Sequence, residues 1–320
     1  MDAFQVTDHA RAPSLRQIEL AAPGPGEVAV RIAACGLNFG DLLMAEGRYQ
    51  EKPPLPFTLG MELAGTITAM GAHVTDLTVG TRVAVLGGNG GLAEAGNFAA
   101  NRCVVVPDQM PFDHAAAFQV AYGTAHVALN HKARLQPGET LLVLGAAGGV
   151  GLTAVEIGKR MGARVIACAR GAAKLEVARA AGAGVLIDSD TADLRSALKA
   201  LGGVDVVYDP VGGDLFRAAM RACNPEARIV IVGFASGDVP QVPANHLLVK
   251  NITLMGFYWG GYIAFKPSVL TDSLKQLYGW YCEGHLHPHI SHTLPLSRAA
   301  EGLELLRSRA STGKVVITTE

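Results

Sequence analysis

The stretch TLLVLGAAGGVGLTAVEIGKRMGARVIACAR, residues 140–170, decides the fold of this chain. The apolar run TLLVLG is typical of a buried strand, and it leads directly into a glycine-rich loop at 145–151. The residues after that loop, GLTAVEIGKRMG, have the spacing of an amphipathic helix that ends at a glycine. A strand, a glycine-rich loop and a helix in this order are typical of a dinucleotide-binding turn.

The loop itself, GAAGGVG, indicates how phosphates would be held at this turn. We expect Gly148 to let the backbone approach a pyrophosphate and Gly151 to let the helix pack closely on the strand. The N–H groups at the start of the helix, and the positive end of its dipole, would attract the phosphates. Because Ala146 replaces the first glycine of the strict pattern, the alternative is a glycine-rich turn with a purely structural role.

The next strand, RVIACA at 164–169, distinguishes between the two nicotinamide cofactors. A protein that binds NAD places Asp or Glu at the end of this strand, where the carboxylate holds the ribose 2′-hydroxyl. Here Arg170 follows the strand, and Lys174 comes one helical turn later. Two cations without an acid suit the 2′-phosphate of NADPH, and the alternative is that both are ordinary surface side chains.

The rest of the chain indicates two folding patterns. Up to about residue 110, short apolar or alternating runs are separated by Gly and Pro, which predicts an antiparallel β domain. From there to about residue 258, strand-like and helix-like segments alternate, and the strands are almost continuously apolar. That pattern predicts a parallel doubly wound sheet covered on both faces. The final segment carries helices and a last strand, KVVITT, and we expect it to fold back on the first domain.

Composition and charge argue against several classes of protein. The 320 residues are 49% hydrophobic and 17% charged, which is typical of a compact α/β protein. The net charge is −1 and no basic run is interleaved with aromatic residues, so we expect no nucleic-acid partner. No apolar run has the length of a membrane span and no signal peptide is apparent, which predicts a cytoplasmic protein without a membrane partner. The five cysteines lie far apart without a C-x-x-C pair, against a disulfide framework or a zinc knuckle.

Several motifs, in the same order along the chain, resemble those of one family. They are GLNFGDLLMAEGRY, QVAYGTAHVAL, GAAGGVG, VVYDPVGG, VGFASG and TGKVVI. Over essentially its whole length the chain resembles the zinc-independent quinone oxidoreductases of the medium-chain dehydrogenase/reductase superfamily, the group that includes zeta-crystallin.

The resemblance implies an α/β fold with two domains. A GroES-like, mainly antiparallel β domain at 1–118 would be the catalytic domain, completed by 259–320. A Rossmann domain with a doubly wound parallel sheet, at 119–258, would bind NADPH in the cleft between the two. Members of the family pair through the last strand of that sheet, which corresponds to NITLMGFY here, so the resemblance implies a homodimer or homotetramer.

The resemblance also implies which residues contact the cofactor. They are Asn38, Thr124, Gly145, Ala147, Gly148, Gly149, Val150, Lys174, Ser189, Val211, Gly233, Phe234, Phe257, Tyr258 and Lys314. Arg170 joins this set because of its charge alone. Relatives often have a tyrosine where this chain has Ser189, so we expect that contact to be weakened or lost.

The positions that hold catalytic zinc in zinc-dependent relatives indicate a protein without metal. Those positions are occupied here by Asn38, Met61 and Ala116, so neither a thiolate nor an imidazole is available. One feature argues the other way: EGHLHPHISH, at 283–292, contains four histidines, of which the first three would share a face of an extended segment. No cysteine or carboxylate arrangement completes a site there, and we predict no metal.

The reaction implied by the resemblance is hydride transfer from NADPH to a small, hydrophobic, electron-poor acceptor, either a quinone or an α,β-unsaturated carbonyl. The protein must stabilise or protonate the oxygen on which charge arrives. Candidates are Asn38 as a donor and Tyr49 as a donor or acid, because related enoyl-thioester reductases have a catalytic tyrosine in a similar G-x-Y setting. The alternative is that Tyr49 only shapes the pocket and solvent supplies the proton. We expect Glu62, in LPFTLGMELAG, to be structural rather than a general base.

Two other functions stay open from the sequence. An enoyl-thioester (acyl-CoA) reductase would need a basic patch for the CoA phosphates, for which Arg48 and Lys52 are thin evidence. A protein that binds NADPH without turning it over is the alternative outside enzymes.

Overall fold

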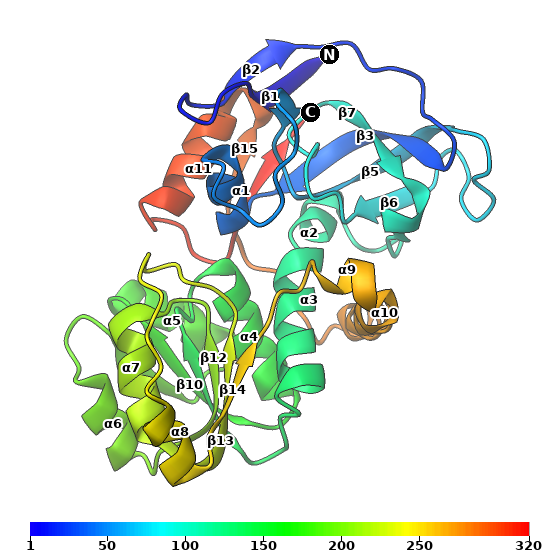
Figure 1. Cartoon of the computed structure of the whole chain (residues 1–320). Helices are drawn as coiled ribbons and strands as arrows, with labels where there is room; N and C mark the ends of the chain where they lie inside the picture. Colours follow the sequence, from blue (N-terminus) through cyan, green and yellow to red (C-terminus); the bar gives the residue numbers. More distant parts are fainter. Residues whose placement is uncertain (320) are drawn as a thin grey trace. The chain divides into compact units, whose positions relative to one another are not determined.

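The computed structural model describes residues 1–319, and the chain divides into two compact units (Figure 1). The first unit contains Met1–Val120 and the chain from Pro288 onward. The second unit contains Ala121–His287.

The segment 259–287 is where the predicted domain limits differ from these units, because it groups with the second unit. Its main helix, α10 (Pro267–Cys282), contacts the π-helix η2 (Val127–Lys132). Trp259 lies directly on Gly123, where an added Cβ would come within 2.8 Å of the indole ring. These packing contacts attach the segment to the helices that precede the parallel sheet.

A mainly antiparallel sheet forms the first unit, which confirms the predicted fold of this part of the chain. Among the described residues its seven strands run in the order β15-β16-β3-β5-β6-β8, with β7 paired to β3, and a smaller sheet has the order β2-β1-β4. Only the pair β15–β16 is parallel in this described set. The strands are β1 (Asp2–Val6), β2 (Ser14–Gln17), β3 (Glu27–Gly36), β4 (Phe57–Thr58), β5 (Glu62–Met70), β6 (Arg82–Val85), β7 (Ala95–Ala99), β8 (Cys103–Val105), β15 (Ile290–Pro295) and β16 (Lys314–Thr318).

The core of the first unit is built on β3 and β5, which read EVAVRIAACG and ELAGTITAM and bury most of their residues. Three helices pack near this sheet: α1 (Phe39–Ala45), α2 (Phe112–Ala116) and α11 (Ala299–Arg307). Helix α2 contacts β3 and β5, while α11 contacts β15, β16 and α1. The short 3₁₀ turns η1 (Ala100–Arg102) and η3 (Leu296–Arg298) precede β8 and α11. The start of α1 and the starts of β5 and β16 therefore belong to one packed unit.

The second unit, which lies wholly within the described residues, holds a six-stranded sheet in the order β11-β10-β9-β12-β13-β14. Every neighbouring pair in it is parallel. In order along the chain this is 3-2-1-4-5-6, the strand order of the Rossmann fold, so the predicted fold class is confirmed. The strands are β9 (Thr140–Leu144), β10 (Arg164–Ala169), β11 (Val185–Asp188), β12 (Val204–Asp209), β13 (Cys223–Ile231) and β14 (Thr253–Gly256).

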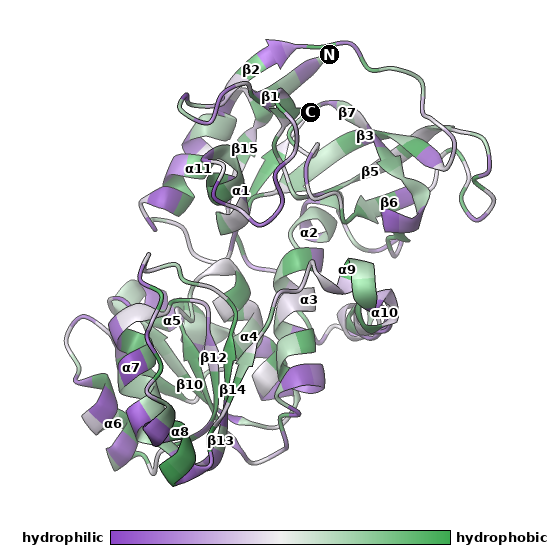
Figure 2. Ribbon diagram, viewed as in Figure 1, coloured by the Kyte–Doolittle hydropathy of each residue, from purple (hydrophilic) through white to green (hydrophobic). Residues whose placement is uncertain are grey.

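Helices cover both faces of this sheet (Figure 1). Apolar residues of several of these helices pack on the strands, and Figure 2 shows the strands largely in green beside helices such as α6 and α7 that carry purple residues. Burial on both faces explains why these strands read as continuous apolar runs in the sequence. The helices of the second unit are α4 (Gly149–Arg160), α5 (Ala172–Ala180), α6 (Leu194–Ala200), α7 (Gly213–Ala222), α8 (Ala244–Lys250) and α9 (Tyr262–Phe265), in addition to α10, η2 and the larger part of α3 (Gln119–His126), whose first two residues belong to the first unit.

A buried histidine joins α3 to α10. The Nδ1 atom of His126 lies 2.8 Å from the hydroxyl of Ser273, and its ring packs edge-on against Trp280 with centroids 5.3 Å apart. Only 2% of His126 is exposed, and this burial lowers the pKa of the imidazole to about 4. The folded chain therefore disfavours the charged form of this side chain.

We predict that protonation of His126 destabilises the protein in mild acid. Between about pH 6.5 and about pH 4 the unfolded chain binds a proton that the folded chain does not, so the free energy of unfolding should fall by up to about 3 kcal/mol across that range. Urea unfolding at several pH values measures this change. The variant His126→Gln serves as the control, because it cannot titrate; equal pH dependence in the variant and the wild type would contradict the prediction.

Candidate functional site

The carboxyl ends of the six parallel strands bring together most of the residues predicted to contact the cofactor. Because the strands are parallel and in register, with Cys168 opposite Leu144 and Ile231 opposite Gly256, their carboxyl ends share one edge of the sheet. The residues that follow the six strands, each at most three positions beyond its strand, are Gly145, Arg170, Ser189, Val211, Gly233, Phe234, Phe257 and Tyr258. Ligands of doubly wound sheets bind at this edge, beside the switch in strand order, here between β9 and β12.

The glycine-rich loop after β9 turns sharply and packs against helix α4. Gly145 has a φ of 61°, a conformation that side chains rarely adopt. At Gly151 an added Cβ would lie 2.2 Å from the carbonyl oxygen of Gly145, so only glycine permits this close approach of helix and loop. The predicted role of Gly151 in close packing is confirmed.

Gly148 has a different environment, although it belongs to the same loop. It is exposed and forms the N-cap of α4, and an added Cβ would meet only the oxygen of Gly145, at 3.4 Å. The protein itself therefore does not require glycine here, whereas a ligand that approaches the N–H groups of the first helical turn would. Gly149 and Val150 belong to that turn, and the N–H groups of a first turn have no partners within their helix. The open space at Gly148 and the N–H groups of the first helical turn both fit a phosphate group.

The remaining predicted contacts of the second unit differ in exposure. Thr124 in α3 and Ala147 in the loop are buried, with 6% and 3% of their surface exposed, as is Phe257 with 8%. Phe234 and Tyr258 are exposed by more than a third. Phe234, Phe257 and Tyr258 follow strands at the sheet edge, and Ala147 belongs to the loop after β9. The contacts of all five residues with a cofactor stay predictions.

At the ends of β10 and β11 the structure adds a carboxylate that the sequence prediction did not include. Asp190 forms an ion pair with Arg170, from Nε to Oδ1 at 3.4 Å. Lys174 lies in the first turn of α5 and Ser189 is half-buried between the two strand ends. The motif DSD after the strand was visible in the sequence, but only the strand pairing shows that it lies beside Arg170.

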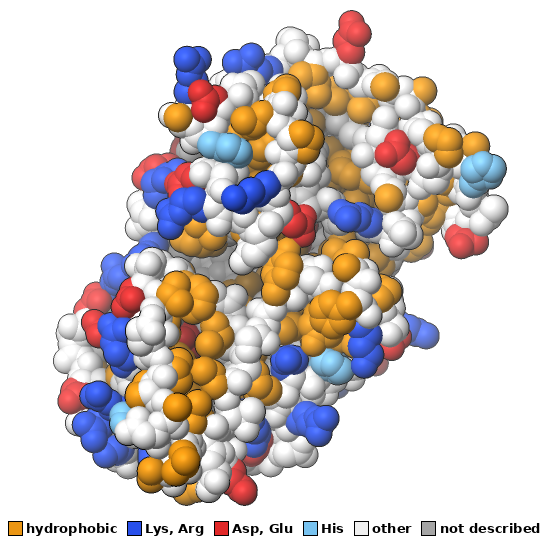
Figure 3. All heavy atoms as spheres, viewed as in Figure 1, with side chains coloured by type: hydrophobic (Ala, Val, Ile, Leu, Met, Phe, Trp, Pro, Cys, Tyr) orange, Lys and Arg blue, Asp and Glu red, His pale blue; other side chains and the backbone are white. Residues whose placement is uncertain are grey.

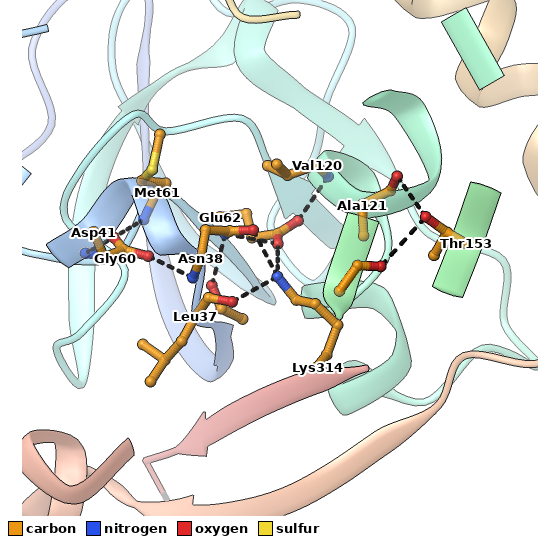
Figure 4. A network of polar contacts seen from close by, with 12 residues as sticks. Leu37, Asn38, Asp41, Gly60, Met61, Glu62, Val120, Ala121, Thr153 and Lys314 are labelled. Carbon is orange, nitrogen blue, oxygen red and sulfur yellow. Dashed lines mark hydrogen bonds and ion pairs between the residues drawn. The ribbon is translucent and has the colours of Figure 1, made fainter. Parts of the chain in front are cut away.

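In the first unit the carboxylate of Glu62 is fully buried at the centre of a polar network (Figure 4). Its Oε1 atom accepts hydrogen bonds from Lys314 Nζ at 2.7 Å and from Asn38 Nδ2 at 3.0 Å, and its Oε2 atom accepts one from the N–H of Val120 at 2.8 Å. Every oxygen of this buried charge has a partner, as low solvation requires. The expectation that Glu62 is structural agrees with these contacts.

The Glu62 carboxylate also accepts a hydrogen bond from the start of helix α3. Val120 is the second residue of α3, and its N–H is one of the groups that a helix leaves unpaired at its start. A negative charge at this end of a helix is favourable because of the helix dipole. Glu62 thus caps a helix that lies 58 residues further along the chain.

Lys314 and Asn38 complete the network. The Lys314 ammonium donates three hydrogen bonds, to Glu62, to the carbonyl oxygen of Leu37 at 2.8 Å and to Asn38 Oδ1 at 2.8 Å. The Asn38 amide nitrogen donates to Glu62 and to the carbonyl oxygen of Gly36 at 3.2 Å. Both side chains were predicted as cofactor contacts, and Asn38 also as a donor to the acceptor. Those roles stay predictions. In the structure, every polar side-chain atom of Asn38 and of Lys314 already has a hydrogen-bond partner within the first unit.

A second buried carboxylate, Asp41, fixes the backbone beside this network. It accepts hydrogen bonds from the N–H groups of Asn38 at 2.8 Å, Gly60 at 3.2 Å and Met61 at 3.1 Å. Burial raises the pKa of this carboxyl group to about 6. Asp41 therefore links the start of α1 to the segment that leads into β5.

Tyr49 and Met61 both lie against Gly40. A Cβ added at this glycine would come within 2.7 Å of the Met61 sulfur and 3.2 Å of the Tyr49 ring. Both side chains are half-buried and pack against the hydrophobic core of the first unit. The predicted acid and the residue at the expected position of a zinc-binding imidazole are thus neighbours, whereas Ala116 is fully buried in α2.

Three of the four histidines of 283–292 contact other side chains. His285 pairs with Glu283 at 3.6 Å, His289 with the Thr312 hydroxyl at 3.0 Å, and His292 with the Ser291 hydroxyl at 2.9 Å. Within residues 1–319, no three His, Cys, Asp or Glu side chains are grouped so that they could hold a metal ion.

Comparison with known proteins agrees with this architecture. The family model described as alcohol dehydrogenase GroES-like domain matches residues 24–108, and the one described as zinc-binding dehydrogenase matches residues 149–274. A quinone oxidoreductase-like protein 2 homolog of Nematostella vectensis is 40% identical over 303 residues, which cover 93% of this chain and 83% of that protein. The chain belongs to the zeta-crystallin-like quinone oxidoreductases of the medium-chain dehydrogenase/reductase superfamily.

Solved structures of quinone oxidoreductases are similar to this family member over its full length. The Escherichia coli quinone oxidoreductase complexed with NADPH has a TM-score of 0.93 and 28% identity, covering 99% of this chain and 100% of that one. The quinone oxidoreductase of Thermus thermophilus, also solved in complex with NADPH, has a TM-score of 0.88 and 30% identity, with coverage of 99% and 100%. In the described part of this chain, no helix combines the length and the apolar character needed to span a membrane.

We predict that the Glu62–Lys314 pair is essential for the stability of the first unit. The variant Lys314→Met leaves the Glu62 carboxylate buried without a cation, so the free energy of unfolding should fall by about 3–5 kcal/mol in urea titrations. The matched control is the double variant Lys314→Met, Glu62→Gln, which removes both charges. Its loss should be smaller than the sum of the two single losses; additive losses would show that the two side chains do not interact.

Proposed function

We propose that this chain is an NADPH-dependent oxidoreductase that transfers hydride, without a metal ion, to a small hydrophobic quinone or α,β-unsaturated carbonyl compound. The observation that carries the proposal is the position of the predicted cofactor residues at the carboxyl edge of a sheet with strand order 3-2-1-4-5-6. Similarity to quinone oxidoreductases solved with NADPH supports the choice of cofactor.

In this proposal each part of the edge binds one part of NADPH. Gly148, Gly149 and Val150 offer backbone N–H groups to the pyrophosphate, because they form the N-cap and the first turn of α4. A Cβ added at Gly148 would meet only the oxygen of Gly145, at 3.4 Å. Arg170 and Lys174 bind the 2′-phosphate by charge. The remaining predicted contacts, which would line the groove or approach the nicotinamide, are Asn38, Thr124, Gly145, Ala147, Ser189, Val211, Gly233, Phe234, Phe257, Tyr258 and Lys314.

NADPH, when bound, supplies the hydride. The protein must then orient the acceptor and provide a proton for the oxygen that takes up the charge. Tyr49 is the proposed proton donor, because a phenolic hydroxyl carries its proton at neutral pH and its ring lies beside Gly40 and Met61.

Three observations support a reaction without zinc. The positions that correspond to zinc ligands are Asn38, Met61 and Ala116, of which only the methionine has a sulfur atom and none has an imidazole or carboxylate. The Lys314 ammonium already lies within 2.8 Å of both Asn38 and Glu62, and its charge would repel a cation placed beside them. The family model named for zinc binding covers 149–274, a range that contains none of these positions.

A second copy of the chain is the proposed partner. Strand β14 lies at the end of the six-stranded sheet, and pairs on one side only within the described residues. Figure 3 shows hydrophobic side chains gathered over the neighbouring helix α8, where Leu248 and Val249 are 77% and 76% exposed. A monomer in light-scattering measurements at micromolar concentration would contradict this part of the proposal.

The acceptor class is tested by following NADPH absorbance with 9,10-phenanthrenequinone, an enal and crotonyl-CoA in separate assays. We expect turnover with the quinone or the enal, and an unchanged rate after treatment with a chelator. Turnover with crotonyl-CoA alone would favour an enoyl-thioester reductase. Binding of NADPH without oxidation by any acceptor would favour a protein that only binds the cofactor.

The variant Tyr49→Phe tests the proton donor in the same assay. It keeps the ring and removes the hydroxyl, so kcat with the enal should fall by about 100-fold while the Kd of NADPH stays the same. If the ring only shapes the pocket, kcat is retained, and that result would contradict the assignment of Tyr49 as the acid.

A further inference from the structure

The ends of β10 and β11 form the part of the sheet edge where the adenosine 2′-phosphate of NADPH would bind. Backbone pairing fixes the two ends to each other: Ala169 lies opposite Asp188, and the N–H of Ser189 donates to the carbonyl oxygen of Ala169 at 3.0 Å. The residues that follow these strands are therefore neighbours because of the sheet, whichever rotamers their side chains adopt.

Asp188 strengthens this connection from its side chain. Its Oδ1 atom accepts hydrogen bonds from the N–H of Gly171, after β10, and from the N–H of Asp190, after β11, both at 3.0 Å. These two N–H groups hold the pKa of the Asp188 carboxyl below its usual range. The loop uses the backbone of Asp190 for this purpose, so the carboxylate of Asp190 is not needed to hold the two strand ends together.

The Asp190 carboxylate instead faces Arg170. The Arg170 Nε atom lies 3.4 Å from Asp190 Oδ1, and the two side chains are 56% and 55% exposed. Exposed pairs of this kind contribute about 0–1 kcal/mol to stability, so the fold gains little from this one. A ligand phosphate competes easily with such a pair for the guanidinium group.

The charges at this corner of the sheet nearly cancel. Arg170 and Lys174 are the two cations assigned to the 2′-phosphate, and Asp188 and Asp190 are two anions on the adjoining loop. The 2′-phosphate is the only group that distinguishes NADPH from NADH. An anion held beside Arg170 therefore weakens the binding of NADPH and has little effect on the binding of NADH.

We propose that Asp190 is a specificity-determining residue of the cofactor site. Its carboxylate holds Arg170 in the free protein and opposes the charge of the 2′-phosphate, so that it lowers the preference of this chain for NADPH over NADH. This inference rests on the proposed function, because it assumes that NADPH binds at this sheet edge.

The variant Asp190→Asn isolates this effect, since it keeps the size of the side chain and the backbone N–H that Asp188 binds. The matched control is Glu283→Gln, which removes one charge from another exposed pair, with Arg160 at 4.0 Å. Arg160 ends α4, so the control lies at the opposite end of that helix from the glycine-rich loop. Asp190→Ser removes the same charge with a smaller side chain.

The measurement is the Kd of NADPH and of NADH by isothermal titration calorimetry, for each protein at low and at high salt. For Asp190→Asn and Asp190→Ser we expect the Kd of NADPH to fall by about three- to tenfold in about 50 mM salt, and the Kd of NADH to change by less than about twofold. Salt screens exposed charges, so the gain should shrink at about 0.5 M. Glu283→Gln should bind both cofactors as the wild type does.

An unchanged or weaker affinity for NADPH in both Asp190 variants would overturn the inference and leave the proposed function standing. An equal gain in affinity for NADH would also overturn it, because the effect would then not involve the 2′-phosphate. A wild-type protein that binds neither cofactor would instead overturn the proposed function, and this inference with it.

Discussion

The buried carboxylate of Glu62 is the constraint on which the interior of the first unit depends. A charge without access to water must be paired, and here its partners come from three separate segments of the chain: the start of α1, the start of β16 and the start of α3. Because each partner must reach the same two oxygen atoms, these segments cannot shift independently. Lys314 adds to this constraint, since its ammonium also binds the backbone at Leu37.

The second unit depends on a simpler constraint, the parallel register of six strands. The central strands β9, β10 and β12 are almost entirely buried, so the polar groups that can meet a ligand are found at their ends. The turns after β9 to β14 carry glycine, charged and aromatic residues in place of the apolar residues inside the sheet. One edge of this sheet therefore holds backbone donors, cations and aromatic rings, which are the groups that a dinucleotide requires.

The sequence predicts the parts of this structure that depend on local pattern. The strand, loop and helix at 140–170 are visible because glycine spacing and apolar periodicity are properties of neighbouring residues. Residues 112–133 form three consecutive elements, α2, α3 and η2. The break lies between α2 and α3, where Glu62 caps the N–H of Val120, a contact between residues 58 apart that no local pattern reveals.

The same limit applies to the candidate site. Arg170 and Lys174 were identified from their place after a strand, but Asp190 belongs to the next strand and becomes a neighbour only through sheet pairing. Lys314 was identified from a motif, whereas its partner Glu62 lies 252 residues away in the chain. Asp190 beside Arg170 and Glu62 beside Lys314 each change the local charge, and both pairs exist only because of the tertiary structure. The sequence motifs therefore indicate the cofactor, but they do not reveal the net charge around it.

Hydrogen–deuterium exchange of the wild-type protein, with and without NADPH, tests most directly whether the cofactor is held at this sheet edge. We predict slower exchange of the backbone N–H groups at 145–151, 170–174 and 189–190 when NADPH is present, because these loops would lie against its phosphates and ribose. Exchange in α11 should stay the same. Unchanged exchange in all three loops at saturating NADPH would contradict the assignment of this edge as the cofactor site.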